Sequence, residues 1–152
     1  MTSSTNIVRL VTENDSPLDA ERPILINPGE YEITLSRYWK GYLYGKSSKL
    51  ILVFRIVTEG SYYGQHIYRC YNIKGLTKRK EIIPKGWHSN FVREYSRLFG
   101  MPRKLRDIGI RQFKHKVFKC RVRTVKKDFK QRPLPDDMQY SVIDELLKVQ
   151  TG

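Results

Sequence analysis

The stretch that decides the fold is residues 49–58, which read Lys-Leu-Ile-Leu-Val-Phe-Arg-Ile-Val-Thr. In an extended chain, successive side chains point to opposite faces. Here both faces are almost entirely apolar, and Arg55 is the one charged residue inside the run. Strands with this pattern are covered on both sides. Residues 49–58 therefore predict a central strand of a β-sheet.

The segments on either side of this strand predict two more. Residues 59–64 read Glu-Gly-Ser-Tyr-Tyr-Gly, which favours a turn. Residues 65–73 then alternate again between apolar and polar, so they form a hairpin with the central strand. Upstream, residues 31–36 have the same period of two after Pro28-Gly29. We therefore expect three consecutive strands.

A helix is expected after a linker rich in Gly, Lys, Arg and Pro. Apolar and aromatic residues recur at helical spacing from Trp87 to Phe99, with Ser89 in the capping position. Gly100 and Pro102 end the pattern.

The last third of the chain predicts two more strands and a helical end. Residues 117–125 alternate as a strand, and residues 139–142 form a short one. Residues 141–149 begin with Ser-x-x-Asp and have apolar residues at helical spacing. Three strands, a helix and two strands is the order of the OB fold. We therefore predict a mainly β protein: a five-stranded OB-fold-like barrel with a helix between the third and fourth strands and a C-terminal helical segment.

Charge is high and unevenly distributed. The 152 residues carry 29 Lys and Arg against 15 Asp and Glu, a net charge of +14. Residues 1–30, however, hold two basic and five acidic residues. We expect residues 1–27 to be an acidic, partly disordered arm, since their composition buries little apolar area, and residues 28–152 to be a single OB-like nucleic-acid-binding domain. The arm either competes for the basic site or is a solvated tail.

Several classes of protein are disfavoured. No apolar run approaches the roughly 20 residues that a membrane-spanning helix needs, and the N-terminus lacks a signal-peptide pattern. The two cysteines, Cys70 and Cys120, form no CxxC motif. Acidic residues are scattered and no Gly-rich phosphate loop is present. We expect a cytoplasmic protein without metal, cofactor, membrane contact or enzymatic activity.

Nucleic acid is the polyanion that the charge predicts. Residues 38–46 (YWKGYLYGK) combine four aromatic residues with two lysines. We expect a loop here whose exposed rings stack on unpaired bases, each base contributing about 1 to 3 kcal/mol. Alternatively, Tyr38 and Trp39 cap the barrel. The candidate binding residues are Tyr38, Trp39, Lys40, Tyr42, Tyr44 and Lys46.

The fourth strand carries an outward row of cations, Lys119, Arg121 and Arg123. They stand about 6.6 to 7 Å apart, which is comparable to the phosphate spacing of an extended strand. A charged edge that prevents aggregation is the alternative interpretation.

Two further groups complete the predicted site. Arg55, Arg69 and Tyr71 are expected to face outward on the central hairpin, an assignment that a one-residue change of register would reverse. The connection between the fourth and fifth strands adds cations and one aromatic residue where an OB barrel closes over its ligand. These are Lys126, Lys127, Phe129, Lys130 and Arg132.

Five segments carry a resemblance to a known family: residues 28–33 (PGEYEI), 49–56 (KLILVFRI) and 59–64 (EGSYYG), and less closely 118–123 (FKCRVR) and 140–143 (YSVI). The sequence resembles the OB-fold single-stranded DNA-binding proteins of bacteriophages and mobile genetic elements. The resemblance implies a protein that coats single strands during replication, recombination or conjugative transfer. Many such proteins end in an acidic tail, whereas this chain ends in an apolar segment, which suits a homodimer.

The leading hypothesis is therefore non-catalytic, sequence-tolerant binding of single-stranded DNA. Two alternatives use the same basic surface. One is binding of RNA or duplex DNA, which needs the aromatic residues less. The other is a basic interaction protein that docks on an acidic protein partner.

Overall fold

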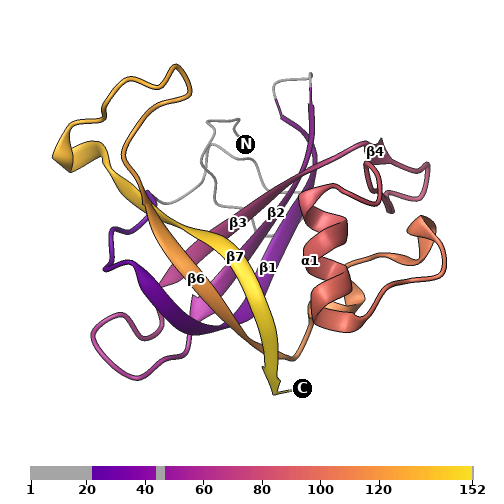
Figure 1. Ribbon diagram of the computed structural model, residues 1–152, viewed down its shortest axis with the longest axis horizontal. Helices are drawn as coiled ribbons and strands as arrows, with labels where there is room; N and C mark the ends of the chain where they lie inside the picture. Colours follow the sequence, from indigo (N-terminus) through magenta and orange to yellow (C-terminus); the bar gives the residue numbers. More distant parts are fainter. Residues whose placement is uncertain (1–21, 44–46, 152) are drawn as a thin grey trace.

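A five-stranded antiparallel sheet forms the body of the molecule (Figure 1). The computed structural model describes residues 22–43 and 47–151. The strands lie in the order β3-β2-β1-β6-β7, and α1 lies between β3 and β6 in the chain, so the predicted mainly β class and the position of the helix are confirmed. The bounds are β1 Gly29–Leu43, β2 Ser47–Ile56, β3 His66–Ile73, α1 Asn90–Phe99, β6 Val117–Val125 and β7 Tyr140–Thr151.

Strand β2 is buried on both faces, as its two-sided apolar pattern predicts. It pairs with β1 on one side and with β3 on the other. Leu52 and Phe54 belong to the main hydrophobic core, and Ile51 and Val53 are buried on the opposite face. Residues 49–56 thus belong to a central strand, as predicted.

Strand β1 is longer than predicted because it continues through a bulge. The pairing with β2 shifts between Leu35 and Arg37, so Ser36 is an extra residue in β1. Because of this bulge, the residues after Ser36 point to the face opposite to the one that strict alternation predicts. Tyr38 then packs against the core, while Trp39 is buried beside Ile51 on the other face. The predicted loop is therefore wrong for residues 38–43; residues 44–46 lie outside the described part.

The predicted C-terminal helix is also wrong, because residues 141–149 belong to β7. Ile143 and Leu146 are three residues apart, which suits a helix, yet both are buried in the core of the sheet. The pairing with β6 shifts on either side of Cys120, so Asp144 and Leu147 are extra residues. These irregularities reproduce helical spacing within a strand. The helical surface on which a homodimer was expected does not exist.

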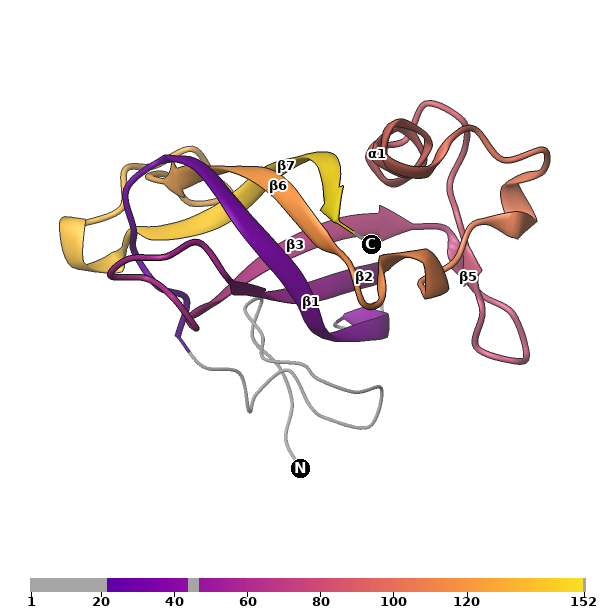
Figure 2. The same ribbon diagram turned by 90° about the horizontal axis from the view of Figure 1, so that it is seen from below.

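The sheet is not closed into a barrel. Its edge strands β3 and β7 lie against each other, but they do not pair. Helix α1 covers one end of the curled sheet (Figure 2), where Phe91 and Tyr95 pack on Phe113, and Phe113 packs on Phe118. Short elements connect these parts: β4 Gly75–Leu76, β5 Ile82–Ile83, η2 Leu105–Asp107, η3 Arg111–Phe113 and η4 Asp136–Met138.

Residues 24–26 attach to the beginning of β7. The Ser141 amide donates to the Ile24 carbonyl at 2.8 Å, and the Ile26 amide donates to Ser141 Oγ at 2.9 Å. The folded unit therefore starts before the expected boundary at residue 28, and residues 1–21 of the predicted arm lie outside the described part. No described helix combines the length and apolar character needed to cross a membrane.

Candidate nucleic-acid interface

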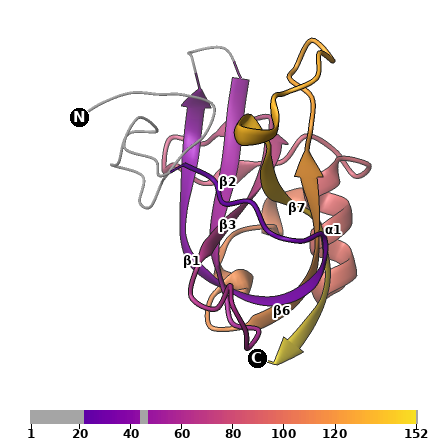
Figure 3. The same cartoon turned by 90° about the vertical axis from the view of Figure 1, so that its left-hand side faces the viewer.

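The connection between β6 and β7 is an ordered basic hairpin (Figure 3). The Asp128 carboxylate accepts hydrogen bonds from the amides of Lys130, at 2.8 Å, and Arg132, at 2.9 Å. The Arg132 Nε lies 3.0 Å from the same carboxylate. Gln131 takes the left-handed conformation, with φ of 64°. The hairpin brings together the predicted residues Lys126, Lys127, Phe129, Lys130 and Arg132.

Phe129 stands out from this hairpin. Its side chain is 84% exposed, the highest value among the large hydrophobic residues of the described part. The Lys130 ammonium lies 5.6 Å from the centre of its ring. The ring is exposed to solvent and lies beside a cation. It can therefore stack on a flat apolar group of a polyanion.

An open pocket of about 590 Å³ lies between this hairpin and β3. This volume is within the range of small-molecule sites, about 300 to 1,000 Å³. The pocket lies where β3 and β7 fail to pair, so it occupies the seam of the sheet. We call it the seam pocket; its polar and aromatic lining comprises Arg22, Tyr68, Arg69, Cys70, Arg123, Lys127, Asp128, Phe129 and Tyr140.

Five residues of the polar and aromatic lining of the seam pocket were not predicted from the sequence as binding residues: Arg22, Tyr68, Cys70, Asp128 and Tyr140. Tyr68 is 7% exposed and lies on the face of β3 opposite Tyr71, and the expected outward orientation of Tyr71 placed that face inward. Arg22 was assigned to the N-terminal arm. A tyrosine within a strand carries no local signal for binding, so only the meeting of distant segments identifies these residues.

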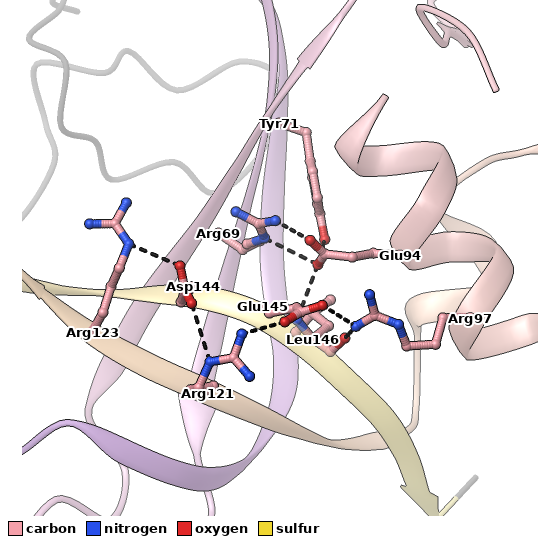
Figure 4. A network of polar contacts seen from close by, with 9 residues as sticks. All are labelled: Arg69, Tyr71, Glu94, Arg97, Arg121, Arg123, Asp144, Glu145 and Leu146. Carbon is pink, nitrogen blue, oxygen red and sulfur yellow. Dashed lines mark hydrogen bonds and ion pairs between the residues drawn. The ribbon is translucent and has the colours of Figure 1, made fainter. Parts of the chain in front are cut away.

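The row of cations on β6 points outward as predicted, but acidic residues neutralise it (Figure 4). Arg121 pairs with Glu145 and with Asp144, the latter at 3.2 Å, and Arg123 Nε lies 3.0 Å from Asp144. Lys119 lies 3.5 Å from Glu30 on β1. These partners leave the row with little net charge for phosphates.

Glu145 shows the strength of this pairing. Partial burial acts to raise the pKa of its carboxyl, but hydrogen bonds from Arg97 and Arg121 outweigh it and hold the pKa below the usual value. Glu145 therefore remains ionised and paired.

The expected outward orientation of Arg69 and Tyr71 is wrong. Tyr71 is only 2% exposed and belongs to the core. Its hydroxyl donates to Glu94 Oε1 at 2.7 Å, and Arg69 pairs with the same carboxylate. Burial, with the Glu94 charge beside it, raises the pKa of Tyr71. This face of β3 is thus inward and pairs with Glu94 on α1, and Arg55 lies on the opposite face of the sheet, as predicted.

The aromatic segment of β1 does not converge on the hairpin. Tyr38 lies between two cations, with Lys40 Nζ at 6.0 Å and Lys114 Nζ at 5.9 Å from its ring centre. Trp39 is buried, and Gly41 leaves room for its ring, since a Cβ there would lie 3.1 Å from Trp39 Cζ2. Tyr42 is 58% exposed near the end of β1. Tyr44 and Lys46 lie outside the described residues.

Comparisons with family models, with curated proteins and with solved structures found no match to the chain. Within residues 22–43 and 47–151, no group of three or more His, Cys, Asp and Glu side chains is placed to hold a metal ion.

The order of the hairpin is expected to depend on the ionisation of Asp128. The Arg132 amide, with that of Lys130, lowers the pKa of Asp128 below its usual value of 3.8. A lowered pKa means that the carboxylate contributes fully above pH 3.8 and loses its contribution as the pH falls through the lower, folded value. We therefore expect the protection of the Lys130 and Arg132 amides, measured as exchange relative to the intrinsic rate at each pH, to fall only in this acidic range.

NMR-detected hydrogen exchange against pH measures this loss of order. In Asp128→Asn, the two amides should exchange faster already at neutral pH, and the acidic step should vanish. Asp136→Asn, on the same connection, should keep the step. A step of unchanged size in Asp128→Asn would contradict the role given to Asp128.

Proposed function

We propose that the chain binds single-stranded DNA non-catalytically, with unpaired bases at the seam pocket and phosphates on the lysines of the β6–β7 hairpin. The observation that carries the proposal is Phe129, an exposed ring on an ordered basic hairpin above an open pocket. Tyr68 and Tyr140 add aromatic surface to the pocket, and Arg22 and Lys127 add charge.

The chemistry of this arrangement suits an unpaired base. Every base has a π-face, so an aromatic residue binds bases with little regard for sequence. The Asp128 hydrogen bonds hold the hairpin in place before binding, which reduces the conformational entropy lost on association. A base paired in a duplex presents only its edge. The rings of Tyr68 and Tyr140, which line the pocket, therefore favour single strands.

The fold supports the same proposal. We propose that the sheet is an OB-like barrel with an open seam, because its pairing order and the position of α1 match the element order of that fold. OB folds bind oligonucleotides on strands 2 and 3 and in the connections 1-2 and 4-5. In this alignment the β6–β7 hairpin is the 4-5 connection, and β3 is a wall of the seam pocket.

The resemblance to the phage and mobile-element proteins extends the proposal to a biological role. The chain would coat single strands in the cytoplasm during replication, recombination or transfer. RNA also has unpaired bases and phosphates that could bind in this way. DNA and RNA are therefore compared directly in the experiment below.

Fluorescence anisotropy tests the proposal with labelled oligo-dT, matched duplex and single-stranded RNA across a salt series. We expect oligo-dT to bind more tightly than the duplex, with a slope of log K against log salt of about −0.7 per phosphate contact. Tighter RNA binding would reassign the site to RNA. Absence of binding to all three at moderate salt would favour an acidic protein partner.

A further inference from the structure

The end of the molecule that carries α1 has a second and larger concentration of cations. It lies at the other end of the longest axis from the β6–β7 hairpin (Figures 1 and 2). The β4–β5 turn and the segment between α1 and β6 meet there, because β5 contacts η2. We call it the α1-end surface; its cations are Lys40, Lys78, Arg79, Lys80, Lys85, Arg103, Lys104, Arg106, Arg111, Lys114 and Lys116.

The backbone beneath these cations is firmly held. Ile108, Ile110 and Phe113 are buried in the core and anchor the segment before β6. In the β4–β5 turn, the Thr77 amide donates to the Glu81 carbonyl at 2.8 Å, and Lys80 takes the left-handed conformation with φ of 64°. The fold therefore fixes the backbone of the two segments that carry most of these cations, and the two segments meet at β5 and η2.

The α1-end surface differs from β6 because its eleven cations have no ion-pair partner among residues 22–43 and 47–151. Within the surface only Glu81 and Asp107 oppose them. Fixed like charges closer than the Debye length, about 8 Å at physiological salt, repel one another. A polyanion relieves this repulsion.

The surface includes a pocket of about 350 Å³. Its charged lining consists of three cations, Lys40, Arg106 and Arg111, and two acidic residues, Glu81 and Asp107. Aromatic groups are few here relative to the eleven cations. Trp87, which follows β5, is 41% exposed, and the Tyr38 ring lies between Lys40 and Lys114. Cations without stacking rings contact phosphates, which position a nucleic acid without reading its bases.

We propose that the α1-end surface binds the phosphate backbone of a DNA duplex. One chain then holds unpaired DNA at the seam pocket and paired DNA at the opposite end. The duplex site rests on its own charges, but this joint arrangement rests on the function proposed above. It suits a junction between single-stranded and double-stranded DNA.

A competition experiment tests whether the two sites are separate. A fluorescent duplex is bound first, and unlabelled oligo-dT of about eight nucleotides, within the usual site size of one OB fold, is added to saturation. We expect the duplex to remain bound. Displacement of the duplex in step with oligo-dT binding would overturn the proposal, because it means one shared site.

Variants locate the duplex site. Arg103→Gln/Lys104→Gln should make the salt slope of duplex binding shallower by about 1.8, since each phosphate contact contributes about 0.9, and leave oligo-dT binding unchanged. Lys78→Gln/Arg79→Gln tests the other loop in the same way. The control, Arg93→Gln/Lys148→Gln, removes the same charge outside both sites. An equal effect of the control on duplex binding would overturn the proposal.

The two proposals fail in different ways. If oligo-dT does not bind while duplex binding still depends on Arg103 and Lys104, the duplex site stands and the single-strand proposal is wrong. If oligo-dT binds and neither loop variant changes duplex binding, the duplex site is wrong and the seam pocket stands.

Discussion

Glu94→Ala is expected to lower the free energy of unfolding by about 3 to 5 kcal/mol, the usual cost of breaking a buried ion pair. The Glu94 side chain is buried between α1 and the sheet and accepts hydrogen bonds from Arg69, from the Tyr71 hydroxyl at 2.7 Å and from the Leu146 amide at 3.1 Å (Figure 4). Alanine leaves all three donors without this acceptor.

The position of Glu94 explains why the effect is large. Arg69 and Tyr71 belong to β3, and Leu146 belongs to β7. These are the two edge strands that do not pair with each other. Glu94 therefore joins them through side-chain hydrogen bonds in place of a backbone ladder, and the same strands supply walls of the seam pocket.

Urea denaturation followed by circular dichroism measures the loss. Glu94→Gln keeps the shape and one acceptor oxygen, so it should cost less than alanine. Glu145→Ala is the matched control, since Glu145 pairs with Arg97 and Arg121 nearer the surface; we expect a cost of about 1 kcal/mol or less. Equal losses for Glu94→Ala and Glu145→Ala would show that Glu94 does not hold the seam together.

Phe129→Ala is expected to weaken oligo-dT binding by about 5- to 150-fold, the equivalent of 1 to 3 kcal/mol for one stacked base. Because the ring is exposed and packs on little of the protein, stability should not change. Anisotropy titration at fixed salt gives the affinity, and the urea midpoint checks the fold.

Tyr63→Ala is the matched control for this loss. Tyr63 is also a well-exposed aromatic residue on a connection, at 57%, but it does not line the seam pocket. A loss of affinity in Tyr63→Ala as large as in Phe129→Ala would contradict the assignment of stacking to Phe129.

The same titration distinguishes the contribution of the hairpin lysines to DNA binding from that of the β6 arginines. Lys126→Gln/Lys127→Gln should make the salt slope of oligo-dT binding shallower by about 1.4, since each phosphate contact on a single strand contributes about 0.7. Arg121→Gln/Arg123→Gln should change it less, because Asp144 and Glu145 already neutralise those cations. A larger effect of Arg121→Gln/Arg123→Gln than of Lys126→Gln/Lys127→Gln would show that the phosphates bind to the cations of β6.

Several features followed from the sequence by itself. The two-sided apolar run of β2, the alternation of β3 and β6 and the aromatic spacing of α1 are local patterns whose period equals that of the element they form. The basic β6–β7 connection was likewise identified from its composition, because a polar segment between two strands lies at the surface whatever the strands pair with.

Only the tertiary structure decided which face of each strand is buried and which cations remain free to bind a polyanion. Residues 141–149 fit a helix by spacing, and pairing with β6, with register shifts at Asp144 and Leu147, makes them a strand. Ile67, Tyr71 and Ile73 of β3 face the core, and Glu94 pairs with Arg69 on that same face. Glu30, Asp144 and Glu145 neutralise cations that are distant in sequence. Each outcome depends on a partner remote in the chain, and a local pattern carries no information about what will pack against it.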